Sequence, residues 1–325
     1  MNSINRIKSL FYPEQYQGWG KKRKYFEGWY FKVLNRERTR AFAFIPGIAM
    51  DLNGRKHAFV QVLDGIEKKS QYHTFDSSLF VPSPGKFELT IGPNRFSSTG
   101  LVLNLPGIKG SLSFSDIVPW PGKWYSPGIM GPYTFAPFME CNHGIVSMDH
   151  AVEGSLETDA EMADFSGGRG YTEKDWGHSF PSAYVWIQSN HFESENISFK
   201  ASVARIPWLT GSFTGFITGL WFDRKLYSFT TYNRSSLKRL IINPSYVEME
   251  FDNPLWNLVL KAYTDRPTPL ASPVRGFMEG RIDESMTSEL DLQMRDKKNG
   301  RLIFSGRGKS ACIEISGPTE TLMPR

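Results

Sequence analysis

The stretch that decides the fold is residues 30–45, Tyr-Phe-Lys-Val-Leu-Asn-Arg-Glu-Arg-Thr-Arg-Ala-Phe-Ala-Phe-Ile. Two runs rich in aromatic and aliphatic residues, 30–34 and 40–45, flank a charged turn at 35–38. Such runs, separated by a short polar turn, are typical of an antiparallel hairpin. The stretch therefore predicts two paired β-strands.

Strand signals recur along the chain, whereas no segment shows a helical period beyond one or two turns. Residues 58–63 lead through Asp64-Gly65 toward 71–75. The second half repeats the pattern at 201–204, 215–221 and 227–232. With 29 glycines and 20 prolines punctuating its 325 residues, the chain predicts an all-β fold of short strands in a sandwich or barrel.

The two halves of the chain match each other at one constant separation. The matching positions are Trp29 with Trp186, Phe59 with Phe216, Phe75 with Tyr232, and residues 101–103 with 258–260. These matches predict an internal duplication, with one antiparallel β-barrel at residues 1–168 and a second at 169–325. Chance matching between aromatic-rich strands is the alternative.

The first half also contains an insertion. Phe165-Ser-Gly-Gly-Arg-Gly and Phe304-Ser-Gly-Arg-Gly correspond at a shorter separation than the other matches, so the first half carries extra residues. The aromatic- and proline-rich stretch 117–139 is the obvious candidate. It is either a lid over a binding site or a proline-stiffened surface loop.

The most chemically suggestive segment is 170–177, Gly-Tyr-Thr-Glu-Lys-Asp-Trp-Gly. Tyr171, Glu173 and Asp175 occupy alternate positions, so in a strand their side chains share one face, with the two carboxylates roughly 7 Å apart. In a buried cleft one of the two acids would stay protonated at neutral pH. The alternative is a solvated edge on which Lys174 neutralises the acids.

Three segments resemble the tocopherol cyclase family. They are Tyr25-Phe-Glu-Gly-Trp-Tyr-Phe-Lys-Val33, Tyr171-Thr-Glu-Lys-Asp-Trp-Gly-His-Ser-Phe-Pro181 and Val185-Trp-Ile-Gln188. Shorter matches at 135–138 and 310–317 extend the resemblance over nearly the whole chain. The resemblance implies two lipocalin-like barrels, a prenylated aromatic or otherwise lipophilic substrate, and no cofactor. In plant and cyanobacterial members a phenol adds across a prenyl double bond to close a chroman ring.

The same segment is also similar to the corresponding stretch of carotenoid hydratases, whose acid protonates an alkene. Tyr171 and Glu173 occupy the matching positions. Where plant cyclases have Asn and Gly, this chain has Asp175 and His178, which adds an acid and an imidazole. We therefore expect Glu173 to be the general acid, Tyr171 to hydrogen-bond to it, and Asp175 or His178 to restore its proton or to accept one from the substrate.

Protonating an alkene requires a dry site in which aromatic faces stabilise the positive charge. The residues expected to contact the ligand are Glu27, Trp29, Tyr30, Trp124, Trp176 and Trp186. Two of these have structural alternatives. Glu27 could instead close a barrel end through a salt bridge to a Lys or Arg. Gly28-Trp29 is similar to the Gly-x-Trp that packs across the bottom of lipocalin barrels, which makes Trp29 structural.

Composition excludes several other functions. The net charge is +5, but the only dense basic run is Lys21-Lys22-Arg23-Lys24, with no interleaved arginine and aromatic stripe, so no nucleic-acid partner is expected. The run suits either an anionic membrane surface or solvent. Neither a catalytic elbow, a phosphate loop nor a zinc-binding pair of histidines occurs. We therefore expect no metal, although Glu140-Cys141-Asn142-His143 is a weak metal-like cluster.

The two cysteines are too few for a disulfide framework, and residues 1–16 lack the apolar run of a signal peptide. Together these features predict a cytoplasmic protein and leave peripheral membrane contact and oligomeric state open. The favoured function is a cofactor-independent cyclase or hydratase. The rival is a lipocalin-type carrier that binds a lipophilic molecule without changing it.

Overall fold

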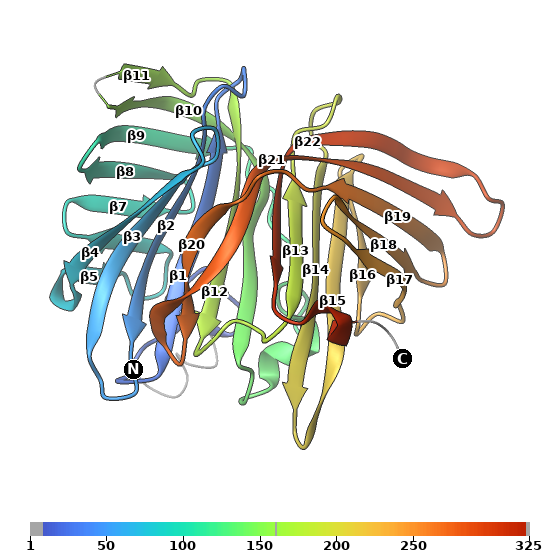
Figure 1. The fold of residues 1–325 in the computed structure, drawn as a ribbon, viewed down its shortest axis with the longest axis horizontal. Helices are drawn as coiled ribbons and strands as arrows, with labels where there is room; N and C mark the ends of the chain where they lie inside the picture. Colours follow the sequence, from blue (N-terminus) through green and yellow to red (C-terminus); the bar gives the residue numbers. More distant parts are fainter. Residues whose placement is uncertain (1–8, 160, 323–325) are drawn as a thin grey trace. The chain divides into compact units, whose positions relative to one another are not determined.

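The computed structural model describes residues 9–159 and 161–322. Residues 1–8, half of the stretch analysed for a signal peptide, lie outside this part. Within it, helices are limited to three short 3-10 turns, η1 (Ser77–Leu79), η2 (Gly131–Phe135) and η3 (Thr319–Leu322). None of the described helices has the length and apolarity needed to cross a bilayer. The prediction of an all-β protein is confirmed (Figure 1).

The first sheet has twelve strands in the order β4-β3-β2-β1-β12-β10-β9-β8-β7-β6-β5, with β11 paired to β10. Its strands are β1 (Tyr25–Leu34), β2 (Ala41–Met50), β3 (Lys56–Asp64), β4 (Lys69–Asp76), β5 (Phe80–Pro82), β6 (Glu88–Ile91), β7 (Asn94–Ser97), β8 (Gly100–Leu105), β9 (Ile108–Ser115), β10 (Cys141–Thr158), β11 (Glu161–Asp164) and β12 (Gly168–Gly177). The hairpin predicted from residues 30–45 is the antiparallel pair β1 and β2.

The second sheet has ten strands in the order β16-β15-β14-β13-β22-β21-β19-β18-β17, with β20 paired to β21. Its strands are β13 (Tyr184–Ser189), β14 (Ser198–Trp208), β15 (Gly211–Phe222), β16 (Lys225–Thr230), β17 (Ser236–Ile242), β18 (Tyr246–Asp252), β19 (Trp256–Tyr263), β20 (Thr268–Val274), β21 (Phe277–Asp296) and β22 (Leu302–Ser316). The strands expected at 201–204, 215–221 and 227–232 correspond to β14, β15 and β16.

The chain divides into two compact units. One holds the described residues up to Phe180 together with Leu270–Arg281, and the other holds 181–269 and 282 onward. Strand β12 pairs with β1 and β10 in the first sheet, although the sequence pattern placed the boundary before it, at residue 168. The segment that carries the candidate acids is therefore a central strand of the first unit.

Each unit has its own apolar core. In the first, one face of the sheet buries residues such as Trp29, Phe31 and Phe44, and in the second, one face buries residues such as Val185 and Phe199. Outer strands such as β8 and β18 alternate between buried and more exposed positions, whereas β1, β2 and β13 are buried along nearly their whole length. The central strands are thus covered on both faces, and a polar side chain there must find partners within the protein.

His150 on β10 is a buried polar residue without such a hydrogen-bond partner. It is 1% exposed, its ring centroid lies 4.4 Å from that of Phe114, and neither ring nitrogen has a hydrogen-bond partner among the described residues. Gly170 lies opposite it on β12, where a Cβ atom would come within 2.2 Å of His150 Nε2. Close packing against His150 therefore explains why residue 170, the last of the Gly-Gly-Arg-Gly stretch, is a glycine. Burial lowers the pKa of His150 to about 3.

We expect His150 to make the fold sensitive to acid. The unfolded chain binds a proton at this residue below about pH 6.5, but the folded chain does not until about pH 3, so stability is lost as the pH falls between these values. At pH 5 the loss is about 2 kcal/mol. Urea unfolding of the wild type and of His150→Phe at pH 7.5 and pH 5 measures it. Parallel pH dependence in the two proteins would contradict this assignment.

Candidate active site

Strand β12 presents two different sets of side chains. Tyr171, Glu173 and Asp175 point to one face, as the alternation in sequence predicted, and Lys174 points to the other, which is the face of the first core. Because β12 lies between β1 and β10, the alternative of a solvated edge is wrong. Tyr171 and Glu173 are both buried.

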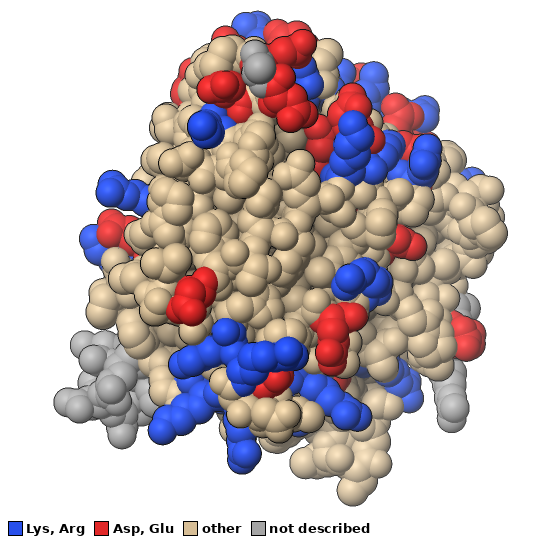
Figure 2. Space-filling view, turned by 60° about the vertical axis from the view of Figure 1, so that its left-hand side comes forward, with Lys and Arg blue, Asp and Glu red and all other residues tan. Residues whose placement is uncertain are grey.

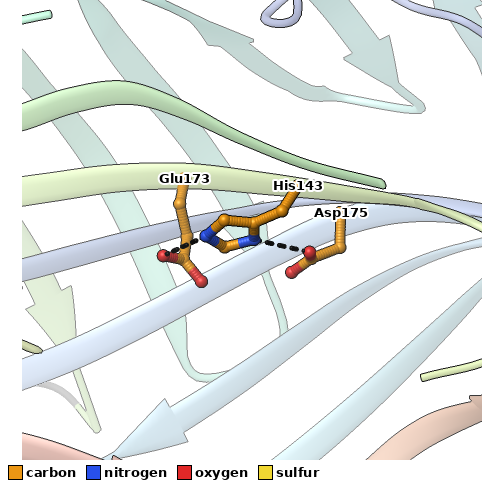
Figure 3. A group of neighbouring side chains, drawn as sticks. All are labelled: His143, Glu173 and Asp175. Carbon is orange, nitrogen blue, oxygen red and sulfur yellow. Dashed lines mark hydrogen bonds and ion pairs between the residues drawn. The ribbon is translucent and has the colours of Figure 1, made fainter. Parts of the chain in front are cut away.

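A chain of polar contacts links four side chains on this face, three of which, His143, Glu173 and Asp175, are drawn in Figure 3. The Tyr171 hydroxyl donates a hydrogen bond to Glu173 Oε2. His143 on β10 lies between the two acids, with Nε2 3.4 Å from Glu173 Oε2 and Nδ1 2.7 Å from Asp175 Oδ1. The imidazole therefore joins a buried carboxyl group to a second carboxyl group.

Exposure rises steadily along this chain. Tyr171 is fully buried, and the exposed fraction of the side chain is 6% for Glu173, 15% for His143 and 23% for Asp175. A proton could thus pass from the partly solvated Asp175 through the imidazole to Glu173. The hydroxyl of Tyr171 occupies the dry end.

Glu173 has both apolar and polar neighbours on this face, including the fully buried Lys32, which pairs with Tyr171 across β1 and β12. Directly across the sheet lie Tyr30 on β1 and Ile145 on β10, both buried, and side chains at paired positions share a face. At the Asp175 end of this row of polar contacts, the Cys141 sulfur lies 3.8 Å from Asp175 Oδ1. Burial, together with the negative charges of Asp175 and Glu140, raises the pKa of the Cys141 thiol well above its usual value, so it stays protonated.

The same three side chains could also hold a metal ion. One ligand atom each from His143, Glu173 and Asp175 lies within 4.8 Å of the others. The two imidazole nitrogens face the two carboxylates: Nδ1 is hydrogen-bonded to Asp175 Oδ1, whereas Nε2 is in ion-pair contact with Glu173 Oε2 and has no hydrogen-bond partner among the described residues. This geometry fits either a proton relay or a metal site.

The opposite face of β12 carries a buried ion pair. Lys174 Nζ lies 2.5 Å from Glu27 Oε1, and both side chains are fully buried. Lys174 also donates to the main-chain oxygens of Pro13 and Gln15. Glu27 accepts hydrogen bonds from the Tyr25 hydroxyl and from the main-chain N–H of residue 17, 2.8 Å away. The salt-bridge interpretation of Glu27 is therefore confirmed, with Lys174 as the partner.

Burial raises the pKa of Glu27, and the charge of Lys174 and the hydrogen bonds to the carboxylate act against that rise. Burial likewise lowers the pKa of Lys174, and Glu27 acts against it. The ammonium group also lies 4.8 Å from the Trp29 ring centroid and 4.6 Å from that of Trp176. Since both Glu27 oxygens already have partners, this acid has little capacity left to act on a substrate.

The remaining predicted site residues lie in different places. Trp29 is in the first core, stacked on Phe87 at 5.3 Å, and its Nε1 donates to Glu14 O. Trp176 packs against that core too. Neither ring shares the face of Glu173, because side chains alternate along each strand.

Of the other predicted residues, Trp186 is buried on β13 in the second unit, on the face opposite Val185 and Ile187. Trp124 lies in the loop between β9 and β10 and is 80% exposed. His178 follows the end of β12, where its Nδ1 lies 3.4 Å from Ser179 Oγ. Burial, with smaller effects from Lys24 and Lys21, lowers the pKa of His178.

Sequence reasoning missed His143 as the imidazole of the site. It named His178 instead, which is close to the acids in sequence. The register that sets His143 directly opposite Asp175 across β10 and β12 determines the contact, and this register includes β-bulges. Two local signals pointed to His143: its place in the weak metal-like cluster 140–143, and the alternation of Cys141, His143 and Ile145 in a strand.

Comparison with known proteins identifies the same family that the sequence motifs resemble. A family model described as Tocopherol cyclase-like matches residues 114–317. A probable chloroplastic tocopherol cyclase of Oryza sativa subsp. japonica is 22% identical over 360 residues, covering 92% of this chain and 76% of the rice protein. The chloroplastic tocopherol cyclase of Zea mays is 23% identical over 191 residues, covering 56% of this chain and 40% of the maize protein.

Solved structures share the fold at low sequence identity. A crystal structure of CghA with Sch210972 matches with a TM-score of 0.56 at 11% identity and covers 90% of this chain and 88% of that chain. A putative AttH from Nitrosomonas europaea matches with a TM-score of 0.51 at 14% identity, covering 90% and 92% of the two chains. The family match covers more than half of the chain and includes both β12 and His143, and on this basis the protein belongs to the tocopherol cyclase-like family.

Proposed function

We propose that this protein is a cofactor-independent enzyme that cyclises or hydrates a prenylated aromatic or other isoprenoid lipid by acid catalysis. The observation that carries the proposal is the chain from Tyr171 through Glu173 and His143 to Asp175. It offers a buried carboxyl group, held by the Tyr171 hydroxyl, and a route for returning its proton. The family and the named relatives support a lipophilic, prenylated substrate.

The proposed reaction balances without an oxidant or a cofactor. The Glu173 carboxyl proton adds to one carbon of the substrate alkene, and the neighbouring carbon becomes a cation. In cyclisation the substrate's own phenol oxygen attacks that cation and loses its proton, whereas in hydration a water molecule does so. The released proton returns to Glu173 through Asp175 and His143. Tyr171 positions the carboxyl group by its hydrogen bond.

We also propose that each sheet closes into a lipocalin-like barrel and that the two arose by duplication. Closure is supported by the edge strands: β4 and β5 are joined by η1 alone, and β16 and β17 by residues 231–235. Duplication is supported by the strand order, in which β1 and β13 hold equivalent places beside β12 and β22. The match of Trp29 with Trp186 does not support it, since Trp29 faces the first core and Trp186 faces away from the second. The match of 101–103 with 258–260 does not support it, since β8 lies two strands from β10 but β19 is next to β21.

The decisive experiment is turnover in deuterium oxide. The purified protein is incubated with a prenylated hydroquinone, and the products are analysed by high-resolution mass spectrometry. Acid-catalysed addition places one non-exchangeable deuterium on carbon, cyclisation leaves the formula otherwise unchanged, and hydration adds one water. Native mass spectrometry of lipids that co-purify with the protein guides the choice of substrate.

The alternatives have distinct outcomes in the same assay. A carrier returns the ligand unchanged and without deuterium, even when binding is tight. Loss of turnover after dialysis against EDTA, with recovery on adding a divalent metal, would replace the relay by a metal site at His143, Glu173 and Asp175. Turnover that EDTA leaves intact supports the proposal.

His143 is expected to act as the relay between Asp175 and Glu173. We predict that His143→Ala lowers kcat by about 10²-fold, because Glu173 is reprotonated slowly, and that added imidazole restores part of the rate. The partial exposure of His143 gives a small molecule access to the vacated space. His73→Ala is the matched control, because His73 is a half-buried histidine on β4, outside the candidate site. Loss of activity without imidazole rescue would mean that His143 is only structural.

A further inference from the structure

One end of the first sheet carries an unusual density of positive charge. β1 and β3 begin there, β2 and β12 end there, and β10 begins there, as the pairings of Tyr25 with Met50 and of Phe26 with Gly177 show. The turn at 275–276 joins this end through a hydrogen bond from Met50 N to Gly276 O, 2.8 Å. We call it the basic end. Its exposed basic residues are Lys21, Lys22, Arg23, Lys24, Arg55, Lys56 and Arg275.

Little negative charge offsets this group. Asp51 is paired with Arg55 at 3.2 Å, and Glu140 is half-buried beside Lys24. Figure 2 shows Lys and Arg side chains gathered in the lower part of the face, while acids and bases are mixed at the top.

Exposed aromatic rings come from two segments that run into the same end. Phe11 and Tyr12 precede the basic run, and the loop between β9 and β10 exposes several more. Phe11 and Phe135 are in contact, with ring centroids 6.2 Å apart. The exposed rings of the loop are Trp124 (80%), Tyr125 (50%), Phe135 (46%) and Phe138 (47%).

Basic side chains at one end of a sheet, with exposed aromatic rings on the segments that lead into that end, are the combination that suits a lipid–water interface. The charges attract anionic headgroups, and the rings enter the headgroup layer. The partly exposed Asp175 lies close to this end, two residues before Gly177. A lipophilic substrate dissolved in a bilayer would therefore be available next to the candidate site.

We propose that the basic end, with the aromatic loop beside it, docks the protein on an anionic phospholipid bilayer. The surface extends the proposed function, because it supplies a membrane-dissolved substrate. Binding to lipid is measured without turnover, so the docking surface and the reaction can fail separately.

The test is co-sedimentation of the full chain with vesicles of phosphatidylcholine with and without phosphatidylglycerol. We expect binding only to the anionic vesicles, weakened by added salt. The triple variant Lys21→Gln/Lys22→Gln/Arg23→Gln is expected to bind roughly 100-fold more weakly.

A matched control removes three charges from the other end of the same strands, as Arg36→Gln/Arg38→Gln/Lys68→Gln in the β1–β2 and β3–β4 turns. It is expected to bind like the wild type. Trp124→Ser is expected to leave the salt dependence unchanged and to weaken binding several-fold. Equal loss in both triple variants, no preference for anionic vesicles, or tighter binding to a DNA duplex than to vesicles would overturn the proposal.

Discussion

Replacing Glu173 with glutamine is expected to abolish turnover while leaving the fold and ligand binding intact. Glutamine has the same shape, and its amide oxygen can still accept the hydrogen bond from Tyr171. What it lacks is an acidic proton to give to an alkene. General acid catalysis contributes about 10²–10⁴-fold to a rate, so we expect kcat to fall by about 10³-fold or more.

The measurement is single-turnover deuterium incorporation, with thermal unfolding and ligand binding followed in parallel. Glu140→Gln is the matched control, because Glu140 is a half-buried acid next to β10 whose contacts do not include the relay. It should keep wild-type turnover. Normal deuterium incorporation by Glu173→Gln would show that Glu173 is not the acid. A marked loss of stability would contradict the expectation that the exchange leaves the fold intact.

Replacing Lys174 with methionine is expected to have the largest effect on stability. Glu27 would be left as a fully buried acid without its cation, and the main-chain oxygens of Pro13 and Gln15 would lose a donor. Removing one partner of a buried ion pair typically costs about 3–5 kcal/mol of the free energy of unfolding. Urea denaturation monitored by tryptophan fluorescence measures the change.

Two further variants separate the ion pair from simple packing. The double variant Glu27→Gln/Lys174→Met removes the stranded charge, so it should be clearly more stable than the single Lys174→Met. Lys86→Met breaks an exposed pair with Glu88, 2.7 Å apart, and should change stability by less than about 1 kcal/mol. A double variant no more stable than the single one would mean that Glu27 carries no uncompensated charge in the single variant.

Most of the fold could be predicted from local sequence. The hairpin at 30–45 could be predicted because its strands are rich in aromatic and aliphatic residues and its turn is charged. Strands β14 to β16 could be predicted from the same kind of pattern. The common face of Tyr171, Glu173 and Asp175 also follows from a strand's two-residue period. These features depend only on neighbours along the chain.

What could not be predicted depends on which strands pair and in what register. His143 meets Asp175 only because β10 pairs with β12, some 30 residues further along the chain. Lys174 meets Glu27 because β1 pairs with β12 in the same sheet, across most of the first unit's length. Trp124 was predicted to touch ligand from its residue type, but its loop leaves it exposed. Non-local pairing leaves no mark in a single sequence.

The placement of Lys174 between Glu173 and Asp175 has a wider consequence. Consecutive residues of one strand contribute to two features, since the lysine anchors the N-terminal segment on one side and the acids belong to the proposed relay on the other. A rigid backbone at this point holds both. Substitutions that weaken the contacts of the Lys174 ammonium group should therefore also slow proton transfer in the proposed relay, although they change none of its side chains. Stability and the proposed activity thus depend on the same short segment of main chain.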